Sequence, residues 1–144
     1  MRFPKEEATF SAHLRTKGLK NTPERLEVLR AIFGKERHFA VEDLVQELHR
    51  RGHAVSRATI YRTLSLLAEG GLIREAVRGN GFTHYEHVHE SQHHDHLLCV
   101  RCGAVVEFVS PEIERLQEEV CKRHGFEPFA HTHQVNGLCR KCRA

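Results

Sequence analysis

The first seventy residues contain four segments in which apolar positions recur every three or four residues, the period of an amphipathic helix. Two segments follow a hydroxyl residue able to cap a helix, Thr22 before Pro23 and Ser56. The apolar positions are Phe10 and Leu14; Leu26, Leu29 and Phe33; Val41, Leu44, Val45 and Leu48; and Ile60, Leu64 and Leu67. The pattern predicts four helices that end at Gly18, Gly34, Gly52 and the Gly70-Gly71 pair.

Two short extended runs follow these helices, at residues 72–77 and 82–87. They flank Asn80-Gly81, a strong signal for a two-residue hairpin turn. Helices followed by a hairpin are the order of a winged helix-turn-helix. We therefore predict a winged-helix DNA-binding domain over residues 1–87.

The pattern changes after a histidine-rich hinge at about residues 87–92. Residues 93–144 read as two strands, a helix and a further extended run, at 93–100, 104–109, 110–125 and 126–135. Ser110-Pro111 begins the helix, and Ile113, Leu116 and Val120 share one side of it. The second half is thus predicted to be a small α/β domain, and the chain as a whole to be α+β.

Composition and charge narrow the possible locations and partners of the protein. No run approaches the roughly 20 apolar residues of a membrane span, and the N-terminal residues lack the apolar core of a signal peptide. We therefore expect a cytoplasmic protein without a membrane partner and with reduced cysteines. Residues 1–80 hold 15 Lys and Arg against 10 Asp and Glu, which suggests a polyanionic partner.

The helix predicted after Ser56 has a polar side that suits a DNA groove. Ile60, Leu64 and Leu67 face inward at about 100° per residue. The opposite side carries Arg57, Ala58, Tyr61, Arg62 and Ser65. Two guanidinium groups and a phenol there can contact base edges or phosphates. The alternative is a solvated face with ordinary arginines.

Four of the five cysteines form two CxxC pairs, Cys99 with Cys102 and Cys139 with Cys142. Four thiolates about 2.3 Å from one ion make the tetrahedral site of a structural zinc. The alternatives are a disulfide and a redox-active pair. The fifth cysteine, Cys121, is predicted to be a small buried hydrophobe.

A second ligand set lies directly before the first CxxC pair. In a strand, His94 and His96 point to one face, while His93 and Asp95 point to the other. Glu107 on the next strand can approach the first face. Imidazoles with carboxylates suit Fe(II), Mn(II), Co(II) or Zn(II). The alternatives are a nonspecific metal scavenger and a solvated patch.

At these residues the sequence resembles the ferric uptake regulator family of bacterial metal-dependent repressors, over nearly the whole chain. The matching segments of the second half are 93–103 (HHDHLLCVRCG), 106–108 (VEF) and 122–126 (KRHGF). Those of the first half are 18–20 (GLK), 22–23 (TP), 41–44 (VEDL) and 58–64 (ATIYRTL).

The resemblance implies a homodimer held together by a dimerisation and metal-binding domain over residues 93–144, with assembly into tetramers left open. The winged helices of the dimer are expected to bind a palindromic double-stranded DNA operator. It implies regulatory metal ligands at His38, Glu86, His94, His96 and Glu107. A further family site would use His93, Asp95, Glu114 and His131. By the same resemblance, Tyr61 and Arg62 lie on the recognition helix and Lys17 contacts DNA. Segment 84–92 has more histidines than the family needs, so His87, His89 and Glu90 remain alternatives to Glu86.

The function implied is a repressor of metal homeostasis, most simply of iron, with Zn(II) structural and Fe(II) or Mn(II) regulatory. We expect no catalysis and no small-molecule substrate. Peroxide-sensing relatives tend to have Asp in place of Glu107, and zinc-sensing relatives tend to use a further cysteine. A zinc hydrolase is disfavoured because the sequence contains no HExxH motif. A metal-storage function is disfavoured because it would not explain the basic helix.

Overall fold

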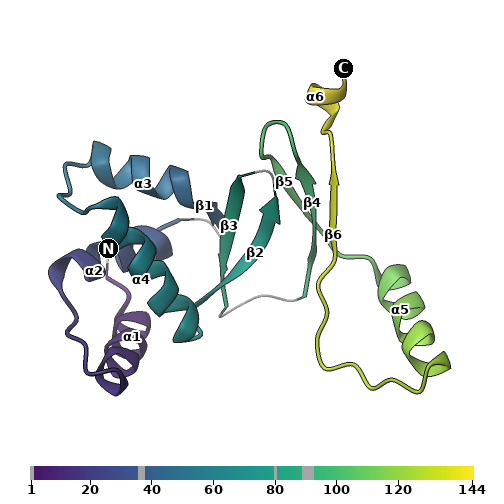
Figure 1. Cartoon of the computed structure of the whole chain (residues 1–144), viewed down its shortest axis with the longest axis horizontal. Coiled ribbons are helices and arrows are strands. Elements are labelled where there is room, and N and C mark those ends of the chain that lie inside the picture. The colour runs from purple at the N-terminus through teal and green to yellow at the C-terminus, as the bar shows by residue number, and fades with distance from the viewer. Residues whose placement is uncertain (1, 36–37, 80, 89–92) are drawn as a thin grey trace. The chain divides into compact units, whose positions relative to one another are not determined.

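The structure is a computed structural model that describes residues 2–35, 38–79, 81–88 and 93–144. The chain divides into two compact units, Met1–Ser91 and Gln92–Ala144, referred to below as the N-terminal and C-terminal units (Figure 1).

The N-terminal unit consists of helices followed by a two-stranded wing, as predicted. Its elements are α1 (Pro4–Thr16), α2 (Pro23–Phe33), β1 (His38–Ala40), α3 (Val41–Arg50), α4 (Arg57–Glu69), β2 (Ile73–Gly79) and β3 (Phe82–His87). The strands form one antiparallel sheet in the order β1-β3-β2. The sequence pattern missed β1, which has three residues and is too short to show alternation. Asn80 of the predicted turn lies outside the described residues.

Local capping begins α2 and α4 where the sequence predicted. The Thr22 hydroxyl accepts a hydrogen bond from the Arg25 backbone N–H at 3.3 Å. The Ser56 hydroxyl accepts one from the Thr59 N–H at 3.1 Å. Each bond satisfies a backbone donor that a helix start otherwise leaves unpaired.

The core of the N-terminal unit joins all four helices to the sheet. Phe10, Leu14, Leu44, Leu64 and other apolar residues at the predicted helical spacing are buried. On α2 the half-buried Leu26 is not part of this core, and Val28 takes a buried place instead. This packing orients α4 so that its polar side is left to solvent.

The C-terminal unit is a small sheet with two helices. Its elements are β4 (Asp95–Cys99), β5 (Val105–Phe108), α5 (Pro111–Arg123), β6 (Gln134–Gly137) and α6 (Arg140–Arg143). In the order β5-β4-β6, β4 pairs antiparallel with β5 and parallel with β6. Gly103 turns the chain between β4 and β5 at a φ of +76°, a conformation that favours glycine. The α+β class is confirmed.

Two details of the C-terminal unit differ from the sequence prediction. The extended run expected at 126–135 is a strand only at 134–137, and Phe129 is 95% exposed. Among the described residues of this unit, the buried apolar side chains are Leu98 and Cys99. Helix α5 buries none of its residues, and Val106 and Leu116 are more than half exposed. Its apolar core is therefore thin.

No helix in the described parts of the chain is long and apolar enough to cross a membrane.

Candidate metal centres and DNA-binding surface

The two CxxC pairs come together at one end of β4. Cys99 ends β4, Cys102 follows in the turn, and Cys139 and Cys142 flank the start of α6. The four sulfur atoms lie within 4.8 Å of one another, and the Cys102 and Cys139 Sγ atoms are 3.8 Å apart. A tetrahedron with zinc–sulfur bonds of about 2.3 Å has an edge of about 3.8 Å. The donor set therefore fits zinc.

The environment of these thiols favours a bound cation. All five cysteines are free rather than disulfide-bonded. Backbone N–H groups of Cys102 and Cys139 direct hydrogen bonds to Cys99, which lowers its pKa to about 6. Hydrogen bonding with the Cys139 side chain raises the pKa of Cys142 to about 12. A divalent cation would favour the deprotonated form of all four. Cys121, predicted to be buried, is only half-buried on α5.

A second group brings His94, His96 and Glu107 together. His96 on β4 lies directly opposite Glu107 on β5. The His94 Nε2 atom is 3.6 Å from Glu107 Oε1, and the two imidazole rings are 4.9 Å apart. One potential ligand atom from each residue lies within 4.8 Å of the others. Both histidines are buried, and their nitrogen and oxygen donors suit Fe(II), Mn(II) or Zn(II).

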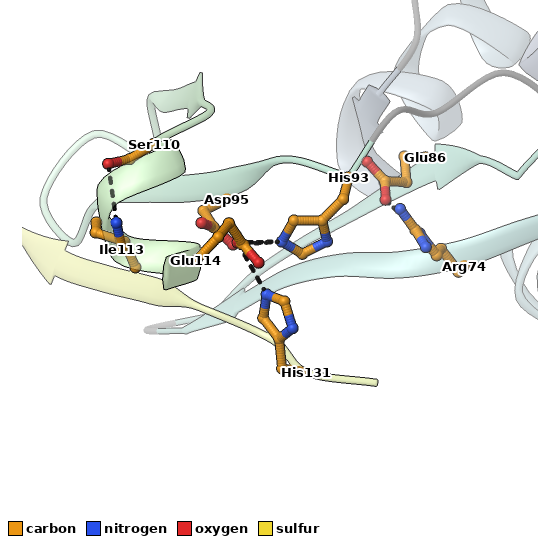
Figure 2. A network of polar contacts seen from close by, with 8 residues as sticks. All are labelled: Arg74, Glu86, His93, Asp95, Ser110, Ile113, Glu114 and His131. Atoms are coloured by element: carbon orange, nitrogen blue, oxygen red, sulfur yellow. Dashed lines mark hydrogen bonds and ion pairs between the residues drawn. The ribbon is translucent and has the colours of Figure 1, made fainter. Parts of the chain in front are cut away.

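The other predicted regulatory ligands, His38 and Glu86, lie in the N-terminal unit. They are direct partners across β1 and β3, so their side chains share one face of that sheet. The Glu86 carboxylate forms an ion pair with Arg74 on β2 (Figure 2).

Of the alternatives to Glu86, His87 is engaged in the N-terminal unit. Its Nε2 atom lies 3.1 Å from the Ile32 carbonyl oxygen, and its ring stacks on Phe33 at 4.6 Å. Burial lowers the pKa of His87. The remaining alternatives, His89 and Glu90, lie outside the described residues.

A third group combines His93, Asp95, Glu114 and His131 (Figure 2). Glu114 Oε1 lies 3.1 Å from Nε2 of both His93 and His131, and Asp95 Oδ1 lies 3.2 Å from Nε2 of His93. Asp95 is 1% exposed, and its Oδ2 atom has no hydrogen-bond partner among the described residues. A buried carboxylate oxygen left unpaired is costly, so this group fits a cation.

Capping of α5 helps to place Glu114. The Ser110 hydroxyl accepts a hydrogen bond from the Ile113 N–H at 3.4 Å and begins the helix there (Figure 2). Glu114 lies in the first turn, where its side chain meets His93. The family resemblance, rather than periodicity or spacing, predicted Glu114 and His131.

The polar side of α4 carries the three residues predicted to contact DNA. Arg57 and Arg62 are exposed, and Tyr61 is 44% exposed. Arg57 forms an ion pair with Glu42 of α3, and the Tyr61 hydroxyl donates to the same carboxylate at 3.5 Å. Arg62 donates from Nε to the Ala58 carbonyl at 3.3 Å. Sequence reasoning missed Glu42, because only the tertiary arrangement of α3 and α4, which both pack against α2, brings it there.

Lys17, predicted to contact DNA next to α1, is also paired with an acid. Its ammonium group forms an ion pair with Glu69 at the end of α4. The His13 Nε2 atom lies 3.7 Å from that same carboxylate. Glu42 and Glu69, the carboxylates paired with predicted DNA contacts, therefore both belong to the winged-helix domain.

Comparison with known proteins agrees with this geometry. The sequence profile of the ferric uptake regulator family matches residues 16–136. A ferric uptake regulation protein of Neisseria gonorrhoeae is 37% identical over 135 residues, which cover 92% of each chain.

Solved structures show the same likeness. The ferric uptake regulator of Helicobacter pylori, described as having three functional metal-binding sites, has a TM-score of 0.86 at 26% identity, covering 100% of this chain and 95% of the other. That of Francisella tularensis, described with iron, has a TM-score of 0.78 at 32% identity, covering 88% and 96%.

A winged helix joined to a unit with thiolate and histidine–carboxylate clusters defines a metal-responsive DNA-binding regulator. The chain belongs to the ferric uptake regulator family, whose members are metal-dependent, DNA-binding repressors of metal homeostasis. The predicted family resemblance is confirmed.

Proposed function

We propose that this protein is an iron-homeostasis repressor whose operator binding is switched on by Fe(II) or Mn(II). The observation that carries the proposal is the separation of two donor chemistries in one unit. Four thiolates form one group, and His94, His96 and Glu107 form another. The soft set suits structural Zn(II), and the mixed set suits a more labile ion.

The proposed regulatory ligands are His94, His96 and Glu107, joined by Glu86 and His38 of the N-terminal unit. When bound, the ion would supply a positive charge that the imidazole and carboxylate donors coordinate. His38 and Glu86 are cross-strand neighbours, so the two proposed ligands of the N-terminal unit lie together on one sheet. If the ion is to change the ratio of DNA-binding to non-binding protein by roughly 10⁴-fold, it must bind the DNA-binding form more favourably by about 5.5 kcal/mol.

The group of His93, Asp95, Glu114 and His131 is proposed to hold an additional metal ion. Its support is the buried Asp95 carboxylate, whose Oδ2 atom has no partner among the described residues.

The proposed partner is a palindromic operator bound by a homodimer, with tetramers as a further assembly. Lys17, Arg57, Tyr61 and Arg62 are the proposed DNA contacts, and all are polar residues of the winged helix. Exposed apolar side chains of the C-terminal unit, such as Val106 and Val120, support a dimer interface there. The proposal places the protein in the bacterial cytoplasm, with no catalytic activity and no small-molecule substrate.

The test is an anaerobic titration of the zinc-loaded protein with Fe(II), Mn(II) and Zn(II), following binding to a labelled palindromic promoter fragment at fixed salt. Salt must be fixed because phosphate contacts make the affinity salt-dependent. We expect binding switched on by Fe(II) or Mn(II). His96→Ala should abolish it without loss of the structural zinc, whereas His124→Ala, an exposed histidine outside all three groups, should not.

The alternatives give different results in the same DNA-binding assay, with a peroxide addition as one further step. A response only to trace Zn(II) would assign the protein to zinc sensing. Release of the Fe(II)-loaded protein from DNA by dilute peroxide would assign it to peroxide sensing. Operator binding that needs no metal, or no binding with any of the three, would overturn the repressor mechanism.

A further inference from the structure

The DNA-facing side of α4 already holds an anionic partner. The Glu42 carboxylate pairs with the Arg57 guanidinium and accepts a hydrogen bond from the Tyr61 hydroxyl at 3.5 Å. Glu42 lies on α3, 15 residues before Arg57 and 19 before Tyr61, so tertiary packing rather than local sequence creates the contact.

A carboxylate in this position offers what a DNA phosphate offers. Both are anionic oxygen acceptors for a guanidinium and a phenol. Arg57 and Glu42 are each more than half exposed, at 55% and 53% for their side chains, so DNA can reach both. The guanidinium of Arg57 is cationic at any physiological pH, so it attracts either acceptor.

The simpler explanation for Glu42 is that an acid stabilises the positive end of the α3 dipole. Asp43 occupies the same first turn and carries the same charge. Among the described contacts, Asp43 forms no ion pair or hydrogen bond with α4. The neighbouring aspartate therefore provides the dipole effect without the contact.

We propose that Glu42 competes with DNA phosphates for Arg57 and so lowers the affinity of the winged helix for DNA. The inference rests on the proposed DNA-binding function of α4 and deepens it. Replacing Glu42 by a phosphate as the acceptor for Arg57 changes the binding free energy little. Arg57 therefore stays paired with Glu42 on a duplex of arbitrary sequence. Hydrogen bonds to base edges add a gain that only the operator supplies. Glu42 thereby lowers the affinity for the many non-operator sequences.

The experiment measures DNA binding by the protein loaded with structural zinc and with whichever of Fe(II), Mn(II) or Zn(II) switches on operator binding in the titration above. Fluorescence anisotropy is followed for the operator and for a random duplex of equal length, at several salt concentrations. The variants are Glu42→Gln, Asp43→Asn, Arg57→Gln and the double variant Glu42→Gln/Arg57→Gln. All three positions are exposed, so thermal melts should be close to wild type.

We expect Glu42→Gln to bind the random duplex about 1.4- to 5-fold more tightly, the range of an exposed ion pair. The salt slope should steepen by about 0.9, which corresponds to one added phosphate contact. Asp43→Asn should change both quantities less. In the Arg57→Gln background, Glu42→Gln should change binding no more than Asp43→Asn does, because its specific action passes through Arg57.

Two results overturn the inference while leaving the proposed function intact. One is a Glu42→Gln protein that matches Asp43→Asn, since only general charge removal would then be at work. The other is a Glu42→Gln effect that exceeds that of Asp43→Asn and persists without Arg57. A wild-type protein that binds neither duplex with any metal overturns the proposed function itself.

Discussion

Removal of the structural zinc should unfold the C-terminal unit and leave the N-terminal unit folded. The two units differ sharply in apolar core. The described residues of the N-terminal unit include a cluster of eighteen buried apolar side chains. In the described part of the C-terminal unit, Leu98 and Cys99 are the buried apolar side chains.

The magnitude follows from that difference. Full burial of a leucine side chain contributes about 1.5–3 kcal/mol. Structural zinc contributes about 10–16 kcal/mol of apparent binding energy at neutral pH, coupled to folding. Metal ligation therefore exceeds the stabilisation from Leu98 several-fold. Without it, the sheet of β4, β5 and β6 should not persist.

The perturbation is Cys139→Ser, with Cys121→Ser as the matched control, because Cys121 is outside the four-cysteine group. Zinc content is measured together with hydrogen exchange by mass spectrometry. We expect the Cys139→Ser protein to lose zinc and to exchange rapidly in β4 and β5, while α2 and α4 stay protected. The control should match the wild type. Retained protection of β4 and β5 in a zinc-free protein would refute the reasoning.

Three further predictions concern the N-terminal unit. Burial lowers the pKa of His87, so on acidification the unfolded chain binds the proton before the folded chain does. Stability is therefore lost as the pH falls below about 6.5. His87→Gln should reduce the change in the thermal unfolding midpoint between pH 7 and pH 5, and an unchanged pH dependence would contradict this. Arg62→Ala should weaken operator binding by about 1–3 kcal/mol without changing metal affinity measured off DNA, and a normal operator affinity would remove Arg62 from the interface. Leu64→Ala, at 1% exposure, should lower the free energy of unfolding by about 2–5 kcal/mol in denaturant titrations, and a loss under 1 kcal/mol would refute its place in the core.

Local signals in the sequence predicted most of the N-terminal unit. The caps at Thr22 and Ser56 and the helical spacing of apolar residues are interactions within one or two turns. The prediction of an extended run over 126–135 was wrong for most of its length. It relied on apolar residues such as Phe126 and Phe129, which are exposed, and apolar residues that the fold does not bury do not indicate a strand.

The candidate sites divide in the same way. CxxC spacing and strand alternation predicted the pairing within each CxxC motif and of His94 with His96, because short-range geometry determines both. The two CxxC pairs are 37 residues apart at Cys102 and Cys139 and meet through tertiary structure, which the four-thiolate ligand set of structural zinc predicted. The contact of Glu42 with Arg57 depends on how two helices pack, which neither spacing nor periodicity encodes. The family resemblance supplied Glu114 and His131, which lie 17 residues apart and meet through tertiary structure.

The seven residues from His93 to Cys99 contribute to all three metal groups. Alternate positions serve opposite faces of one strand, and the last residue belongs to the thiolate set. A one-residue insertion or deletion within this segment would exchange the two faces and move Cys99 out of register with Gly137 of β6, two residues before Cys139. Such a change would disturb every candidate metal centre at once. We therefore expect this segment to accept some substitutions during evolution but almost no change in length.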